Sequence, residues 1–139
     1  MDYLIDFDPT HRVLRTTVRT ALTDESLMEI YQAVARLASH GGPYNATILD
    51  LSQVVDFPVS HDTIRALAEM DPAVPGEGPR VVVAPRPALY GLCRMFELYR
   101  DSMGGNLVTV VSSIDKAYEF LNVSPADFSQ RLFPESMAA

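Results

Sequence analysis

The chain has 139 residues, the length of a single domain that can bury about two-thirds of the surface its unfolded state exposes. Hydrophobic residues make up 47% and charged residues 21%, a balance that excludes a disordered chain. The formal net charge of −7 repels nucleic-acid phosphates and anionic lipid surfaces, so we expect neither as a partner.

The first third of the chain predicts a hairpin followed by a long helix. β-Branched and aromatic residues fill Tyr3–Phe7 and Arg12–Thr20, and Asp8–His11 between them favours a tight turn. We therefore expect an antiparallel hairpin at the edge of a sheet. Apolar residues then recur at helical spacing from the candidate N-cap Thr23 to the stop signal Gly41–Pro43.

The rest of the chain alternates strands with helices, which predicts a largely parallel sheet. The predicted strands are Thr47–Leu51, Arg80–Ala84 and Leu107–Val111, and the predicted helices begin at His61, at Pro87, after Ser113 and after Ser124, the last holding Phe128 and Leu132. The predicted fold is a single α/β domain over residues 1–133, with a mixed five-stranded sheet and four to five helices. Residues 134–139 are expected to form a frayed tail.

Several stretches carry a family resemblance. The strand that ends in Asp-Leu-Ser before the Ser60-capped helix, together with Arg80–Pro85, Tyr90–Glu97 and Ala117–Leu121, resembles STAS domains, in particular the bacterial SpoIIAA-like proteins related to STAS and CRAL-TRIO domains. The resemblance implies a regulatory or binding module without chemistry of its own, in which a serine at the start of this helix can be phosphorylated to break a partner complex. Only Ser60 corresponds to that serine, and His61 replaces the glycine that follows it in the family motif.

Loops after the parallel strands are predicted to gather on one rim of the sheet, where ligands of open α/β folds usually bind. We define this rim as Ser52–Ser60, Pro85–Pro87 and Ser112–Ser113. Candidate contacts for a ligand or partner lie on it or close to it: Asp50, Ser52, Phe57, Pro58, His61, Arg86, Tyr90 and Arg94.

The polar candidates each have a functional and a structural interpretation. Ser60 is a candidate phosphosite at a helix N-terminus, or it simply caps that helix. Asp50 could act as an acid, a base or a cation ligand, but an aspartate at a strand end more often orients the loop after it. Ser60, His61 and Asp62 are close in sequence, but no Gly-x-Ser-x-Gly elbow accompanies them, so we expect no catalytic residues.

The apolar and basic candidates are equally open to two interpretations. Phe57, Pro58 and Tyr90 could wall a small apolar pocket, in which Arg86 or Arg94 holds an anionic group. Alternatively, Phe57 closes the end of the sheet and Arg94 pairs with Glu97 on its own helix.

Our leading hypothesis is a non-enzymatic, cytoplasmic regulatory or binding module that contacts a protein partner through the Phe57–Ile64 rim and the helix that follows it. The alternative is a carrier or sensor of a small apolar anion or lipid at the rim. Cys93 is expected in the core, and with three dispersed histidines it makes neither a disulfide nor a spaced zinc site, so we expect no metal or cofactor. The acidic N-terminus and the short apolar runs predict no membrane span, and a homodimer could form through the hairpin edge or the third helix.

Overall fold

The structure, a computed structural model, describes residues 2–104 and 108–134. Over these residues a sheet of six strands is flanked by four α-helices and one 3₁₀-helix, which confirms the α/β class. The strands are β1 (Tyr3–Asp8), β2 (Val13–Ala21), β3 (Ala46–Asp56), β4 (Arg80–Val83), β5 (Val108–Val111) and β6 (Gln130–Phe133). The helices are α1 (Asp24–Gly41), α2 (His61–Glu69), α3 (Pro87–Ser102), α4 (Ile114–Leu121) and the 3₁₀-helix η1 (Pro125–Asp127). Leu107 of the predicted last strand, and the predicted tail from residue 135 onward, lie outside the described residues.

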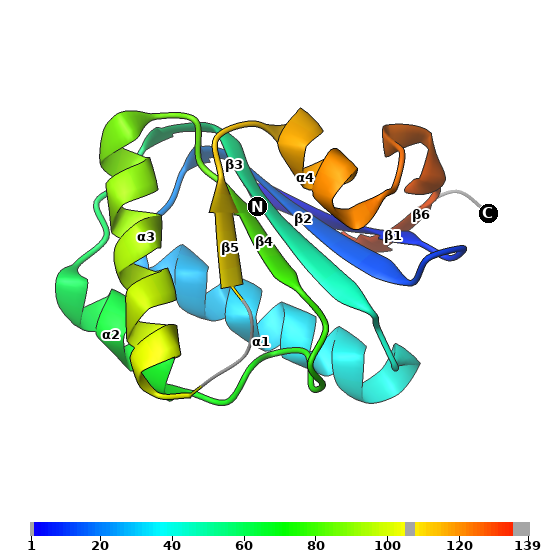
Figure 1. Cartoon of the computed structure of the whole chain (residues 1–139), viewed down its shortest axis with the longest axis horizontal. Helices are drawn as coiled ribbons and strands as arrows, with labels where there is room; N and C mark the ends of the chain where they lie inside the picture. Colours follow the sequence, from blue (N-terminus) through cyan, green and yellow to red (C-terminus); the bar gives the residue numbers. More distant parts are fainter. Residues whose placement is uncertain (1, 105–107, 135–139) are drawn as a thin grey trace.

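The sheet is mixed, with the strand order β5-β4-β3-β2-β1-β6. Strands β2 to β5 pair in parallel, whereas β1 pairs antiparallel with both β2 and β6. Figure 1 shows α2 and α3 side by side at the left, and α4 lies at the upper right, where it contacts β3, β4 and β5. Within the described ranges, no helix has the length and apolar character needed to cross a membrane.

The predicted N-terminal hairpin forms, but it does not lie at the sheet edge as predicted. Asp8 Oδ1 accepts hydrogen bonds from the backbone N–H groups of Thr10 and His11, at 2.8 and 3.1 Å, which fixes the turn. β6 covers the outer side of β1, and the rings of Tyr3 and Phe133 stack with centroids 4.8 Å apart. The hairpin edge that a homodimer could have used is therefore occupied by the chain itself.

The prediction of five strands is wrong because the segment that holds Leu132 is a strand and not a helix. The capping signature at Ser124 builds only one 3₁₀ turn, in which the Ser124 N–H donates to Asp127 Oδ2 at 2.9 Å. The chain then extends through β6 and pairs with β1. This pairing satisfies backbone groups of β1 that would otherwise form an open edge.

Strand β3 is longer than the predicted strand Thr47–Leu51 and replaces much of the expected loop. Its parallel pairing with β2 continues to Asp56, which lies opposite Ala21. Its pairing with β4 ends at Asp50, opposite Val83. The last residues of β3 therefore extend beyond β4.

Side chains alternate between the two faces of the sheet and build two cores. β4 is buried on both faces, as predicted, because Val82 belongs to the larger core and Val81 and Val83 belong to the smaller one. The larger core lies under α1, α2 and α3. The smaller core lies under α4 and includes Ala117 and Phe128.

Candidate functional site

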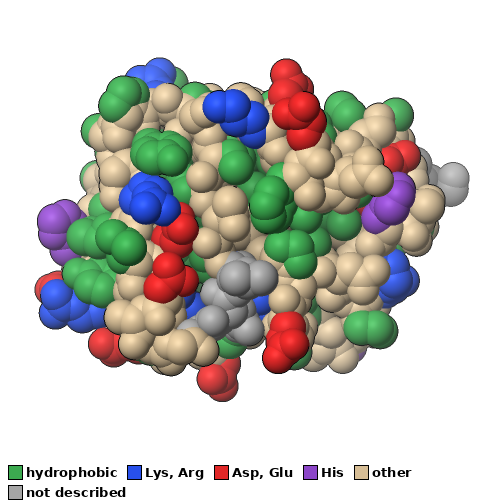
Figure 2. Space-filling model, in the orientation of Figure 1, with side chains coloured by type: hydrophobic (Ala, Val, Ile, Leu, Met, Phe, Trp, Pro, Cys, Tyr) green, Lys and Arg blue, Asp and Glu red, His purple; other side chains and the backbone are tan. Residues whose placement is uncertain are grey.

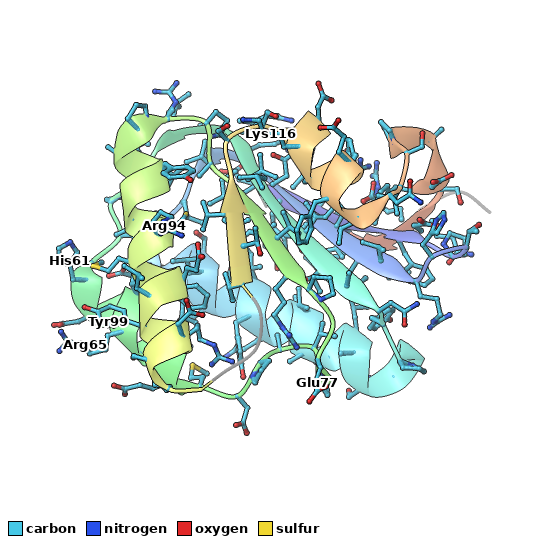
Figure 3. The ribbon with its side chains drawn as sticks, in the orientation of Figure 1. His61, Arg65, Glu77, Arg94, Tyr99 and Lys116 are labelled. Carbon is cyan, nitrogen blue, oxygen red and sulfur yellow. The ribbon has the colours of Figure 1, made fainter. Side chains whose placement is uncertain are left out.

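The rim of the sheet forms where the carboxyl ends of β3, β4 and β5 meet and where α2, α3 and α4 begin. In Figure 3, Lys116 marks this end of the sheet, and Glu77, in the loop before β4, marks the opposite end. Ser113 caps α4 at the rim, and Lys116 Nζ donates to Ser112 Oγ at 2.9 Å. The two ends of the sheet carry different chemistry.

Ser60 is the N-cap of α2. Its Oγ accepts a hydrogen bond from the Thr63 N–H at 3.1 Å, and its own N–H donates to Asp24 Oδ1 at 2.9 Å. The hydrogen bond from the Ser60 N–H lowers the pKa of the Asp24 carboxyl. A phosphate on Ser60 would therefore meet the negative charges of Asp24 and of Asp62 in the first turn of α2.

The polar candidates Asp50, Ser52 and His61 make local contacts. Asp50 is buried, and its Oδ1 accepts a hydrogen bond from the Ser52 N–H at 2.9 Å, the bond by which an aspartate orients its own backbone. His61 is exposed, at the outer edge of α2 in Figure 3. Across residues 2–104 and 108–134, no hydrogen bond joins Asp50, Ser60 and His61 into the relay that nucleophilic catalysis needs.

The other rim candidates are spread over the start of α3 and the loop before α2. Phe57 and Tyr90 are half-buried and pack against the larger core, whereas Pro58 and Arg86 are exposed. Arg94 Nη1 lies 2.7 Å from Glu97 Oε1, one turn along α3. None of the predicted rim contacts lines the cavity that the structure contains in the larger core.

This cavity has a volume of about 220 Å³ and lies between the sheet and helices α1, α2 and α3. Most of the side chains that line it are apolar. Representative lining residues are Ile30 and Val34 of α1, Leu67 of α2, Val82 of β4, and Cys93 and Phe96 of α3. The cavity is partly open to the surface, and a partly open apolar space of this size is a candidate ligand site.

Cys93 contributes an apolar surface to the cavity. Burial raises the pKa of its thiol to about 12, so the thiolate that reacts or binds metal is scarce at neutral pH. The residue is partly buried and packs against the larger core, as expected from the apolar face of its helix.

Two arginines line the cavity, and the more buried one is Arg100 of α3, which is 7% exposed. Its Nη1 donates to the carbonyl oxygens of Ala68 and Met70, at 2.9 and 2.8 Å. These carbonyls lie at the end of α2, the negative end of its dipole. Arg100 therefore acts as a charged cap that ties α3 to the C-terminus of α2.

The second arginine is Arg80, the first residue of β4, at the end of the sheet opposite to the rim. Its Nη1 donates to the Gly78 carbonyl oxygen at 2.9 Å, and its Nη2 donates to the carbonyl oxygens of Gly76, at 3.0 Å, and Val74. Burial, and then the positive charge of Arg100, lower the pKa of the Arg80 guanidinium. The cavity thus has a positively charged end.

On the opposite face of the sheet, a third arginine, Arg15, is paired with a carboxylate. Arg15 forms a two-pronged ion pair with Asp6, with its Nε 2.9 Å from Oδ1 and its Nη2 2.5 Å from Oδ2. Its Nη1 donates to the Tyr118 hydroxyl at 2.6 Å, and its guanidinium lies 4.4 Å from the centre of the Phe128 ring. Although burial acts to lower the pKa of Arg15, its hydrogen bond and charge interaction with Asp6 outweigh burial and raise it.

The structure also brings together Asp8, His11 and Asp127, which sequence spacing does not connect. His11 Nδ1 lies 2.7 Å from Asp8 Oδ2 and 3.7 Å from Asp127 Oδ2. Asp8 is fully buried and already accepts two backbone hydrogen bonds within the hairpin turn. The cluster is explained by its role in joining the hairpin to η1, and we assign no metal to it.

The sequence contained a signal for Arg100 that the prediction of the α3 apolar face missed. Leu89, Cys93, Phe96 and Arg100 are spaced at four, three and four residues, so the arginine continues the buried stripe of the helix. A charged residue on such a stripe indicates a buried polar contact. The carbonyl partners of Arg80 could not be read in this way, because they depend on the path of the loop before β4.

No family model matches this sequence, and no curated protein matches it either. The structure of the anti-sigma factor antagonist SpoIIAA in its unphosphorylated form is similar to this chain, with a TM-score of 0.48 and 9% sequence identity, over 86% of this chain and 97% of that chain.

Proposed function

We propose that this protein is a non-catalytic binding module that holds a small apolar molecule between its sheet and helices α1, α2 and α3. The cavity of about 220 Å³ in the larger core carries this proposal, because its lining is mostly aliphatic and aromatic. The thiol of Cys93 and the hydrogen bonds of Ser60 and Asp50 support a role in binding rather than in chemistry.

The size of the cavity limits the ligand. An engineered protein cavity of about 150 Å³ lined by Leu, Ile and Phe stays dry and binds benzene, whereas pockets for drug-sized ligands start at about 300 Å³. The cavity described here lies between these values. The expected ligand is therefore a single ring or a short to medium hydrocarbon chain.

The proposal is tested by titrating the isotope-labelled protein with octan-1-ol and following backbone amide shifts by NMR. We expect saturable shifts at lining residues such as Leu67 and Val82. Cys93→Leu fills the cavity and should weaken binding by at least about tenfold, whereas Cys93→Ala enlarges it and should preserve binding. Absence of saturable shifts in the wild type, or equal affinity in all three proteins, would refute the proposal.

A second function, contact with a protein partner at the rim, is favoured by the projecting end of β3. Beyond Asp50, β3 pairs only with β2 among the described strands, which leaves one side of its backbone open. Val55 lies on this projection with 57% of its surface exposed. Open strand edges beside exposed apolar side chains are common sites of peptide and protein contact, so this rim supports a regulatory module.

Val55→Asp tests the rim better than a change at Phe57, because Phe57 packs against the core and its loss would disturb folding. The matched control is Phe120→Asp, at a side chain that is 54% exposed on α4. We expect proteins recovered from a lysate by the wild type to be recovered by Phe120→Asp and lost with Val55→Asp. Equal recovery by all three proteins would argue against the rim as a contact surface.

A further inference from the structure

Arg80 places a positive charge at one end of the cavity, although most of the lining is apolar. Arg80 lines the cavity at the amino end of β4, and its guanidinium donates three hydrogen bonds, all to backbone carbonyls of the preceding loop. Among residues 2–104 and 108–134, no carboxylate lies within 4.0 Å of it. Carbonyl oxygens orient a guanidinium, but they leave its unit charge in place.

The charge around Arg80 is reinforced by its neighbour. Arg100 lines the same cavity, and its positive charge contributes to lowering the pKa of Arg80, so the two cations act on the same region. Asp71 also lines the cavity, but it is exposed, and its backbone carbonyl oxygen accepts a hydrogen bond from the Tyr31 hydroxyl at 2.5 Å. A positive potential is therefore concentrated at one end of an apolar space, in a protein whose net charge is −7.

We propose that the bound molecule is a small anionic amphiphile, with a carboxylate or phosphate head group at Arg80 and its hydrocarbon part in the cavity. This inference rests on the proposed function. A guanidinium N–H donates a charge-assisted hydrogen bond to either kind of oxyanion, and this bond is strong where water is excluded. The Nε–H of Arg80 makes no hydrogen bond to a described residue and can donate to such a head group.

The test compares three ligands of equal chain length: octanoate, octyl phosphate and octan-1-ol. Their Kd values are measured at pH 7 by calorimetry with the wild type, Arg80→Met and the control Arg86→Met, whose arginine is exposed and outside the cavity. At least one anion should bind the wild type and Arg86→Met about tenfold more tightly than the alcohol, and this preference should disappear in Arg80→Met. The stronger anion identifies the head group.

The outcomes separate the two proposals. If octan-1-ol binds as tightly as both anions in the wild type, the proposed function stands and the anionic ligand is overturned. If none of the three ligands binds, the proposed function itself fails. A preference for an anion that survives unchanged in Arg80→Met would overturn the role of this arginine.

A measurement on the wild type keeps the role of Arg80 testable if Arg80→Met does not fold. Amide shifts in the octanoate complex are compared with those in the octan-1-ol complex. The largest differences are expected at Val74–Arg80, whose carbonyls surround the guanidinium. Differences confined to residues at the rim, such as Ser60 and Arg86, would place the head group elsewhere and overturn the assignment.

Discussion

Two arginines on opposite faces of the same sheet show how differently this fold treats a buried charge. Arg15, between the sheet and α4, faces the Asp6 carboxylate, the Tyr118 hydroxyl and the ring of Phe128. Arg80, beside the cavity, contacts only backbone carbonyls among the described residues. The pKa of Arg15 is raised, because Asp6 outweighs burial, and the pKa of Arg80 is lowered by burial and by Arg100.

The difference separates an arginine that is paired within the fold from one that no described carboxylate neutralises. An arginine paired with a buried carboxylate is neutralised locally and holds two strands together, so its removal leaves an uncompensated charge. An arginine oriented by carbonyls retains its charge. The face under α4 therefore pairs its arginine with a carboxylate, whereas the face under α1, α2 and α3 holds Arg80, which no described carboxylate pairs with.

The largest expected effect concerns the thiol on the cavity face. Because burial raises the pKa of Cys93 from 9.0 to about 12, its thiolate fraction at pH 8 should be about a thousandfold below that of an exposed cysteine. Alkylation by iodoacetamide at pH 8 should be slower to the same degree. The matched control is Phe120→Cys with Cys93→Ser, which moves the thiol to the exposed surface of α4. Rates within about tenfold of one another would contradict a thiol whose pKa is raised by burial.

Breaking the closed face should cost the most stability. Arg15→Met leaves the Asp6 carboxylate, whose side chain is 12% exposed, without its cation. We expect the free energy of unfolding, measured by urea denaturation, to fall by about 3 kcal/mol. Arg15→Met combined with Asp6→Leu should recover most of this loss, because an apolar pair of similar volume often replaces a buried ion pair at little cost. A double variant no more stable than Arg15→Met would show that the pair is not the source of the loss.

The charged cap on the cavity side should be weaker than the ion pair. Arg100→Met removes both hydrogen bonds to the end of α2, and we expect a loss of about 2 kcal/mol in the same assay. The control Arg86→Met, at the exposed start of α3, should stay within about 0.5 kcal/mol of the wild type. A loss equal to that of Arg15→Met would mean that both faces depend on their arginine to the same degree.

Local chemistry made much of this fold predictable. The cap at Thr23, the stop at Gly41 and Gly42, and the apolar run of β4 act over a few residues, and the structure has each of them. The sixth strand was missed because the capping signature at Ser124 predicts a helix. The segment after it forms a strand because it pairs with the otherwise open edge of β1. Propensity acts locally, whereas strand pairing depends on parts of the chain that are distant in sequence.

The candidate site was less accessible to sequence reasoning. The rule that ligands bind at the carboxyl ends of parallel strands directed attention to Asp50 and Phe57. The cavity lies in the core, with Arg80 at the amino end of β4. The cavity is the space left unfilled where α1, α2 and α3 pack on the sheet, and no sequence pattern predicts such a space. The only signal in the sequence was the spacing that places Arg100 on the buried stripe of α3 and so indicates a buried charge near the cavity.

The smallest expected effect concerns the N-terminal end of α2. Ser60 caps this end of the helix, whereas Arg100 caps its C-terminal end. Ser60→Ala removes the bond to the Thr63 N–H and should lower the free energy of unfolding, measured by urea denaturation at pH 7, by about 1 kcal/mol.

Ser60→Asp keeps an acceptor but adds a carboxyl beside Asp24, whose own pKa is lowered by the bond from the Ser60 N–H. Repulsion by Asp24 and Asp62 disfavours the ionised form of this carboxyl, so its pKa should be higher in the folded state than in the unfolded state. Stability should then be lost as the pH rises from 4 to 7. A Ser60→Asp protein as stable as the wild type at pH 7 would show that this helix start accepts a negative charge despite Asp24 and Asp62.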